Sequence, residues 1–128
     1  MRIRNANIYT EEHRFVRGDA AVENGRFVSC TGEPAGEEAV VDAEGMYLIP
    51  GLVDIHFHGC KGADMCDGTK EALDVITSYE ASVGVTSVCP ATMTIPKDEL
   101  LEVMKNAGSY EYSGGSHLVG INMEGPFI

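Results

Sequence analysis

The alternation of hydrophobic and polar residues changes its rhythm at Pro50. Before Pro50 the apolar runs are short, as in RIRNANIY and DAAVENGRFVSC, and turn residues separate them. The Asn24–Gly25 pair lies between two such runs and accepts the positive φ angles of a tight hairpin turn. A polar loop, EPAGEE, and a Glu44–Gly45 turn between two further short strands follow. These features predict a small β segment over residues 1–49.

After Pro50 the pattern predicts helices and longer strands in alternation. Two stretches have amphipathic helical spacing, TKEALDVITSYEASVG (69–84) and PKDELLEVMKNAG (96–108). Thr69 or Asp67 can cap the first helix, and Gly84 suits its C-terminal end. Three stretches are typical of strands: GLVDIHFH, VTSVCPA and SHLVGINMEG. The order β-α-β-α-β implies parallel strands with right-handed crossovers, so an α/β segment is predicted over residues 50–128.

The first of these strands, GLVDIHFH, contains two histidines in an otherwise apolar run. Side chains alternate across a strand, which predicts one face with Val53, Ile55 and Phe57 and the other with Asp54, His56 and His58. The apolar face is expected to pack against helices. The two imidazoles are expected near the carboxyl end of the strand, about 6.5 Å apart along the backbone. Because that end carries the chemistry in parallel α/β folds, a metal-binding or catalytic role is favoured over two hydrogen-bonded core histidines.

The third predicted strand ends in a carboxylate, Glu124, just before Gly125–Pro126. A buried carboxylate is costly unless it is paired or binds a cation. If the first and third strands are parallel and close, His56, His58 and Glu124 reach the same rim of the sheet. Two imidazoles and one carboxylate form a ligand set for Zn²⁺ or Fe²⁺. The alternative is a Glu124 that lies on a solvated loop.

Charge and composition narrow the classes of partner. The formal net charge is −11, from 9 Lys and Arg residues against 20 Asp and Glu residues. Such a chain has no general attraction for nucleic acid or anionic lipid, which favours a small-molecule partner. No apolar stretch has the length of a membrane span or of a signal peptide, so a cytoplasmic location is expected. No CxxC motif is present, and free thiols are expected at all four cysteines: Cys30, Cys60, Cys66 and Cys89.

Three stretches together resemble one known family. LIPGLVDIHFHG is similar to the first barrel strand of the amidohydrolase superfamily, and GVTSVCPATMT and LVGINMEGPFI resemble the N-acetylglucosamine-6-phosphate deacetylases within it. The resemblance covers the whole chain. It implies that residues 1–49 are part of a small β-sandwich. It also implies that residues 50–128 are the first three β/α units of a metal-dependent hydrolase TIM-like barrel, which is therefore incomplete.

The resemblance also implies an activity and a site. In the family a divalent metal, Zn²⁺ or a similar ion, supports hydrolysis of an amino-sugar phosphate to glucosamine 6-phosphate and acetate, a step of amino-sugar catabolism. The Glu of EGPF is the shared metal ligand and corresponds to Glu124. The H-x-H pair binds a second ion in some members and corresponds to His56 and His58. Asn122 stands where many members have His, and it is not expected to be a strong ligand.

Other functional groups of the family have no counterpart in the 128 residues. The resemblance implies that the catalytic Asp, two more metal-binding His residues and most substrate contacts lie beyond Ile128. The chain alone is therefore expected to be inactive. His13 and His117 match no motif and are expected to have surface roles, with His117 preceding the third strand.

Two alternatives to a deacetylase stay open at this point. Another amidohydrolase, such as a cyclic-amide or purine hydrolase, suits the H-x-H pair equally well but suits MEGPF poorly. The other hypothesis is a truncated, non-catalytic fragment or an assembly module. Three parallel strands with two helices leave a sheet edge and apolar faces uncovered, which predicts self-association of the fragment or a homo-oligomer.

Overall fold

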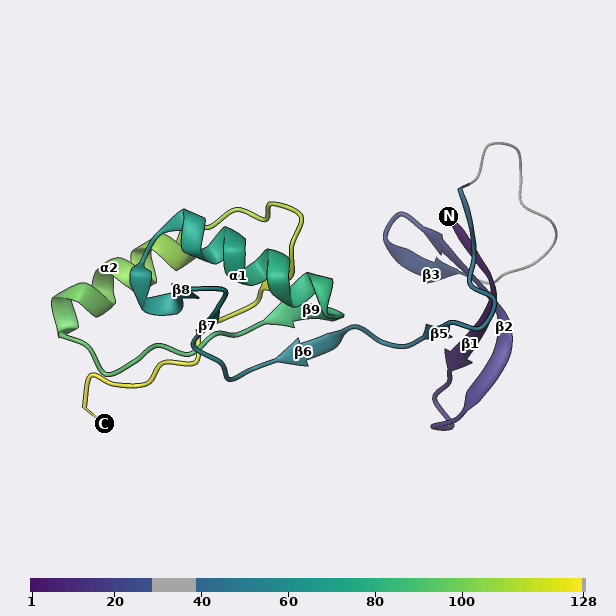
Figure 1. The fold of residues 1–128 in the computed structure, drawn as a ribbon, viewed down its shortest axis with the longest axis horizontal. Helices are drawn as coiled ribbons and strands as arrows, with labels where there is room; N and C mark the ends of the chain where they lie inside the picture. The colour runs from purple at the N-terminus through teal and green to yellow at the C-terminus, as the bar shows by residue number, and fades with distance from the viewer. Residues whose placement is uncertain (29–38, 128) are drawn as a thin grey trace. The chain divides into compact units, whose positions relative to one another are not determined.

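The computed structural model describes residues 1–28 and 39–127. The chain divides into two compact units, Met1–Pro50 and Gly51–Ile128, and each has its own sheet (Figure 1). The predicted loop EPAGEE and Cys30 lie outside the described residues. Within the described ranges, no helix has the length and hydrophobicity needed to cross a bilayer.

The N-terminal unit is a five-stranded sheet built on β1. β2 pairs antiparallel with β1, and β3 pairs antiparallel with β2. Between β2 and β3, Asn24 has φ 50° and Gly25 has φ 72°, which confirms the predicted hairpin turn. β4 and β5 both lie parallel to β1, and the turn between them contains Gly45 at φ 77°. The strands are β1 (Arg2–Tyr9), β2 (Phe15–Glu23), β3 (Arg26–Val28), β4 (Val40–Asp42) and β5 (Tyr47–Leu48).

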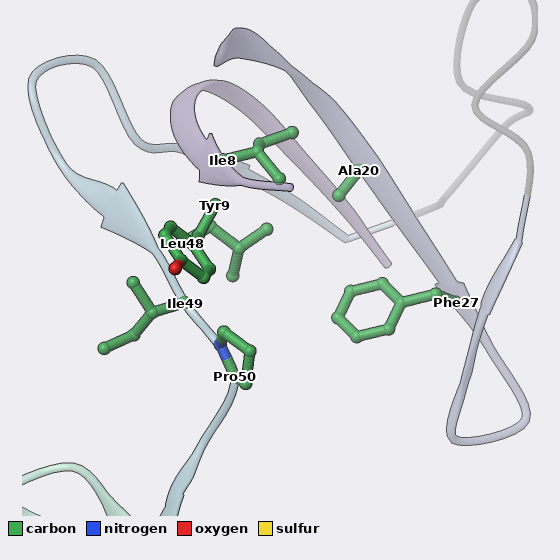
Figure 2. Close-up of a pocket in the computed structure, with 7 residues that line it drawn as sticks. All are labelled: Ile8, Tyr9, Ala20, Phe27, Leu48, Ile49 and Pro50. Atoms are coloured by element: carbon green, nitrogen blue, oxygen red, sulfur yellow. The ribbon is translucent and has the colours of Figure 1, made fainter. Parts of the chain in front are cut away.

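An apolar hollow of about 260 Å³ opens on this unit (Figure 2). It is lined by side chains of four strands and of the two residues after β5: Ile8, Tyr9, Ala20, Phe27, Leu48, Ile49 and Pro50. The Phe27 side chain is 71% exposed. An aromatic ring with this exposure leaves most of its apolar area in water, so the hollow is an uncovered hydrophobic face of the unit.

The second unit carries the parallel sheet and both α-helices. The sheet has the order β10-β9-β6, and β9 pairs in parallel with each neighbour, which confirms the β-α-β-α-β prediction. The strands are not closed into a barrel within the described residues. The elements are β6 (Leu52–Asp54), β7 (Gly59–Cys60), β8 (Ala63–Asp64), the 3-10 helix η1 (Met65–Asp67), α1 (Lys70–Ser82), β9 (Val85–Val88), α2 (Lys97–Gly108) and β10 (His117–Leu118).

The first helix begins and ends where its sequence predicts. The Thr69 hydroxyl accepts the Ala72 N–H at 3.2 Å, so Thr69 is the cap, while Asp67 belongs to η1. After the helix, Gly84 has φ 92°. The helix buries Leu73 against α2 and η1, in a core cluster with Met65, Val103 and Ala107.

All three strands predicted after Pro50 are shorter than expected, and β9 ends at Val88, within VTSVCPA. β6 ends at Asp54, where the carboxylate accepts the His56 N–H at 3.0 Å. This local bond competes with the regular strand ladder. The expected packing face is wrong for the described chain, because Val53 and Ile55 are 60% and 64% exposed. β10 comprises only His117–Leu118, so His117 begins this strand and does not precede it.

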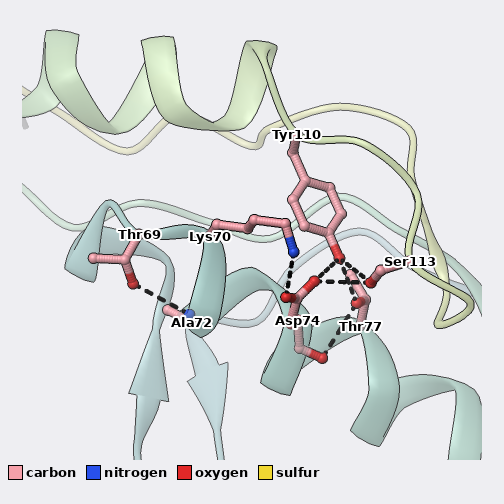
Figure 3. A network of polar contacts seen from close by, with 7 residues as sticks. All are labelled: Thr69, Lys70, Ala72, Asp74, Thr77, Tyr110 and Ser113. Atoms are coloured by element: carbon pink, nitrogen blue, oxygen red, sulfur yellow. Dashed lines mark hydrogen bonds and ion pairs between the residues drawn. The ribbon is translucent and has the colours of Figure 1, made fainter.

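A polar network ties α1 to the segment before β10 (Figure 3). The Asp74 carboxylate accepts hydrogen bonds from Lys70 at 2.6 Å and from Tyr110 and Ser113 at 2.8 Å each. These donors, Lys70 first, lower the pKa of Asp74 to about 2. The network joins α1 to the segment between α2 and β10.

Candidate metal centre

Three side chains that are far apart in the sequence meet beyond the carboxyl ends of β6 and β10. His56, His58 and Glu124 each offer one ligand atom, and these atoms all lie within 4.8 Å of one another. Nε2 of His58 is 3.8 Å from Oε2 of Glu124. The two imidazole rings stand edge to face, with centroids 5.6 Å apart. The structure thus brings together the three residues that were predicted as ligands.

His56 and His58 lie past the end of β6, so strand alternation does not place them. The Asp54 carboxylate holds the backbone of His56. On the other side, Nδ2 of Asn122 donates to the Ile55 carbonyl at 2.9 Å and lies 3.0 Å from Nδ1 of His56. Asn122 therefore contacts a predicted ligand through its amide.

Glu124 also lies beyond its strand, in a stretch without regular secondary structure. It is followed by Gly125, whose φ of +90° is a conformation that side chains rarely adopt. A Cβ at Gly125 would lie 2.9 Å from Cα of Thr94. Both the backbone angle and the close approach require glycine at this position, which explains physically why the EGPF and PATMT stretches fit together.

The geometry fits a divalent cation. Two ligand atoms on one Zn²⁺ ion are about 3.4 Å apart, given bonds of about 2.0–2.1 Å. The 3.8 Å between His58 and Glu124 is near this value. Their side chains are 35% and 37% exposed, so an ion can reach them from solvent. Nδ1 of His58 is buried and has no hydrogen-bond partner among the described residues, which leaves Nε2, on the side of Glu124, as the nitrogen that can bind an ion.

The other histidines and cysteines that the structure describes do not join this group. The His13 ring lies 3.1 Å from the Tyr9 hydroxyl in the other unit, and the exposed His117 ring stacks on Tyr112 at 4.3 Å. The described cysteines are all free: Cys60, Cys66 and Cys89. Burial raises the pKa of the Cys66 thiol, whose sulfur accepts the Met93 N–H.

The sequence did not predict a role for one residue of the site, Thr92. It lies in PATMT, is fully buried and contacts Glu124 through its hydroxyl. The available signal was the position of a hydroxyl residue just after a strand that neighbours both ligand strands. A single threonine in a turn-rich stretch is nevertheless common, so the sequence did not distinguish it from a structural residue.

A parallel sheet with an H-x-H pair and a glutamate beyond its strand ends resembles the first part of an amidohydrolase. Known proteins make this more specific. N-acetylglucosamine-6-phosphate deacetylase of Bacillus subtilis is 30% identical over 98% of this chain and 34% of its own length. N-acetylgalactosamine-6-phosphate deacetylase from a strain of Escherichia coli is 30% identical over 70% of this chain and 24% of its own length. No protein-family model matches the sequence.

The solved structures agree on the fold. N-acetylglucosamine-6-phosphate deacetylase from Pasteurella multocida superimposes with a TM-score of 0.85, at 22% identity, over 99% of this chain and 34% of that one. The chain is therefore homologous to the N-terminal portion of N-acetylglucosamine-6-phosphate deacetylases, as its motifs predicted. It spans about a third of the length of these relatives.

Proposed function

We propose that the chain supplies the N-terminal part of a metal-dependent deacetylase that releases acetate from N-acetylglucosamine 6-phosphate. The observation that carries this proposal is the meeting of His56, His58 and Glu124 within 4.8 Å, in a chain homologous to such deacetylases. One relative is named for the galactosamine epimer. The galactosamine phosphate is therefore the substrate against which the first should be compared.

In this proposal the two segments have separate roles. Residues 1–49 belong to a β-sandwich, and residues 50–128 form the first three β/α units of a barrel. The three units bring their strand ends to one rim, where the ligands gather. The sandwich segment contributes no ligand among its described residues.

Each side chain of the site has a distinct task. The carboxylate of Glu124 supplies negative charge to a divalent ion, Zn²⁺ or Fe²⁺, and His56 and His58 add neutral imidazole ligands. When bound, such an ion lowers the pKa of a water molecule and polarises the acetamide carbonyl. Asn122 orients His56 through its amide contact. The group that transfers a proton to the leaving amine is an aspartate outside these 128 residues.

Metal binding tests the proposal directly in the 128-residue chain. Glu124→Gln keeps the shape of the side chain and removes its charge. We expect it to weaken Co²⁺ binding more than about 100-fold, because loss of a ligand exceeds the 10–100-fold effect of losing an outer-shell partner. Glu111→Gln, at an exposed position of the same unit, is the matched control and should bind as the native chain does.

Isothermal titration with Co²⁺ or Zn²⁺ measures this difference. Equal affinities of the native chain and the Glu124→Gln variant would refute the ligand assignment. Acetate release from N-acetylglucosamine 6-phosphate is expected only from a polypeptide that also supplies the proton-transferring aspartate. Metal-dependent turnover by the pure 128-residue chain would contradict that part of the proposal.

A further inference from the structure

The hydroxyl of Thr92 binds both backbone polar groups of Glu124. Oγ1 of Thr92 accepts the Glu124 N–H at 3.0 Å and donates to the Glu124 carbonyl oxygen at 3.1 Å. The Thr92 residue is 0% exposed. A buried hydroxyl that uses its hydrogen and a lone pair on the same residue restrains that residue in two directions.

The contact between Thr92 and Glu124 lies beyond the last backbone pairing of the sheet. β10 ends at Leu118, and the last pairing beyond it is the isolated bridge between Ala91 and Asn122. There the Thr92 N–H donates to the Asn122 carbonyl at 3.2 Å, and the Asn122 N–H donates to the Pro90 carbonyl at 2.9 Å. The ladder does not reach Glu124. In the described chain, the Thr92 side chain is the group that continues it.

We propose that Thr92 is a positioning residue for Glu124: it fixes the backbone from which the metal-binding carboxylate projects. The connection to metal rests on the proposed function, whereas the restraint of Glu124 stands on the hydrogen bonds alone. Gly125 lies close to Thr94, two residues after Thr92, so the PATMT stretch contacts both Glu124 and the residue that follows it.

The chain offers a matched control at Thr77. This threonine is also buried, with 1% exposure, and its hydroxyl contacts the Tyr110 hydroxyl at 3.1 Å, away from the metal centre. Thr92→Val and Thr77→Val each remove one buried hydroxyl and nearly preserve volume. Thr92→Ser keeps the hydroxyl and loses only the methyl group.

Two measurements on the 128-residue chain separate the proposal from the proposed function. Amide hydrogen exchange of Glu124, followed by NMR, reports the restraint without any metal. Co²⁺ titration, followed by visible absorption, reports the ligand geometry. We expect Thr92→Val to lower the protection of the Glu124 amide about tenfold, as for loss of one hydrogen bond. We expect it to weaken Co²⁺ binding 10–100-fold, the range for outer-shell partners.

The controls define the alternative outcomes. Thr92→Ser should restore both values to within about threefold, and Thr77→Val should change neither. A native Glu124 amide that exchanges freely would overturn the proposal, even if Thr92→Val failed to fold. So would unchanged protection and Co²⁺ binding in a folded Thr92→Val variant. If the amide protection depends on Thr92 but the native chain binds no Co²⁺, the restraint holds and the metal function falls.

Discussion

Replacing Gly125 by alanine should disturb the centre of the EGPF stretch. The backbone at Gly125 has φ +90°, and an added Cβ would lie 2.9 Å from Cα of Thr94 and 3.2 Å from its Oγ1. Positive φ costs an L-residue about 1–2 kcal/mol. Forcing a methyl group into a filled space costs about 1–3 kcal/mol more. We therefore expect Gly125→Ala to lower the free energy of unfolding by roughly 2–5 kcal/mol.

Gly84 provides the comparison that isolates crowding from backbone strain. Its φ is +92°, yet nothing lies within 4 Å of an added Cβ. Gly84→Ala should cost only the backbone term, about 1–2 kcal/mol. Urea unfolding of both variants measures the difference, and Co²⁺ titration shows whether Glu124 moves. If Gly125→Ala is no less stable than Gly84→Ala and binds Co²⁺ like the native chain, the packing account of EGPF is wrong.

Three further predictions concern stability and association. Burial raises the pKa of Glu80, and the nearby charge of Asp54 raises it further, so the charged form of Glu80 destabilises the fold. Glu80→Gln should therefore raise Tm at pH 7.5 and change it little at pH 4. The pKa of Asp74 is lowered to about 2, so the stability that its charged form contributes is present above pH 3.8 and is lost as the pH falls through 2. In Asp74→Asn, Tm should therefore depend less on pH over that interval. The exposed Phe27 and Val53 predict self-association, and a single monomer in sedimentation velocity would contradict this.

The helices and the hairpin were predictable because their signals are local. Thr69 caps α1 through its own side chain, and the Asn24–Gly25 turn needs only the φ angles that these two residues accept. The parallel pairing of β6, β9 and β10 also follows from the order of the elements. The α/β class was therefore accessible from the sequence.

The lengths of the strands were not accessible from the hydrophobic pattern, because individual side-chain hydrogen bonds decide where a strand ends. β6 stops where the Asp54 carboxylate bonds to His56, and an apolar-polar alternation contains no trace of that choice. The sequence predicted that His56, His58 and Glu124 lie together, but it placed them on strands. All three lie past the ends of those strands. Thr92 could not be recognised, because its role depends on a partner 32 residues away.

The contacts at this centre join residues that are far apart along the chain. Asn122 reaches back 66 residues to His56, and Glu124 reaches back 32 residues to Thr92. The contact between Asn122 and His56 spans both crossovers and the contact between Glu124 and Thr92 spans the one through α2, and closing each of these loops costs entropy. An ion held there would bind the native chain and not the unfolded one. The melting temperature would therefore rise with the concentration of the ion.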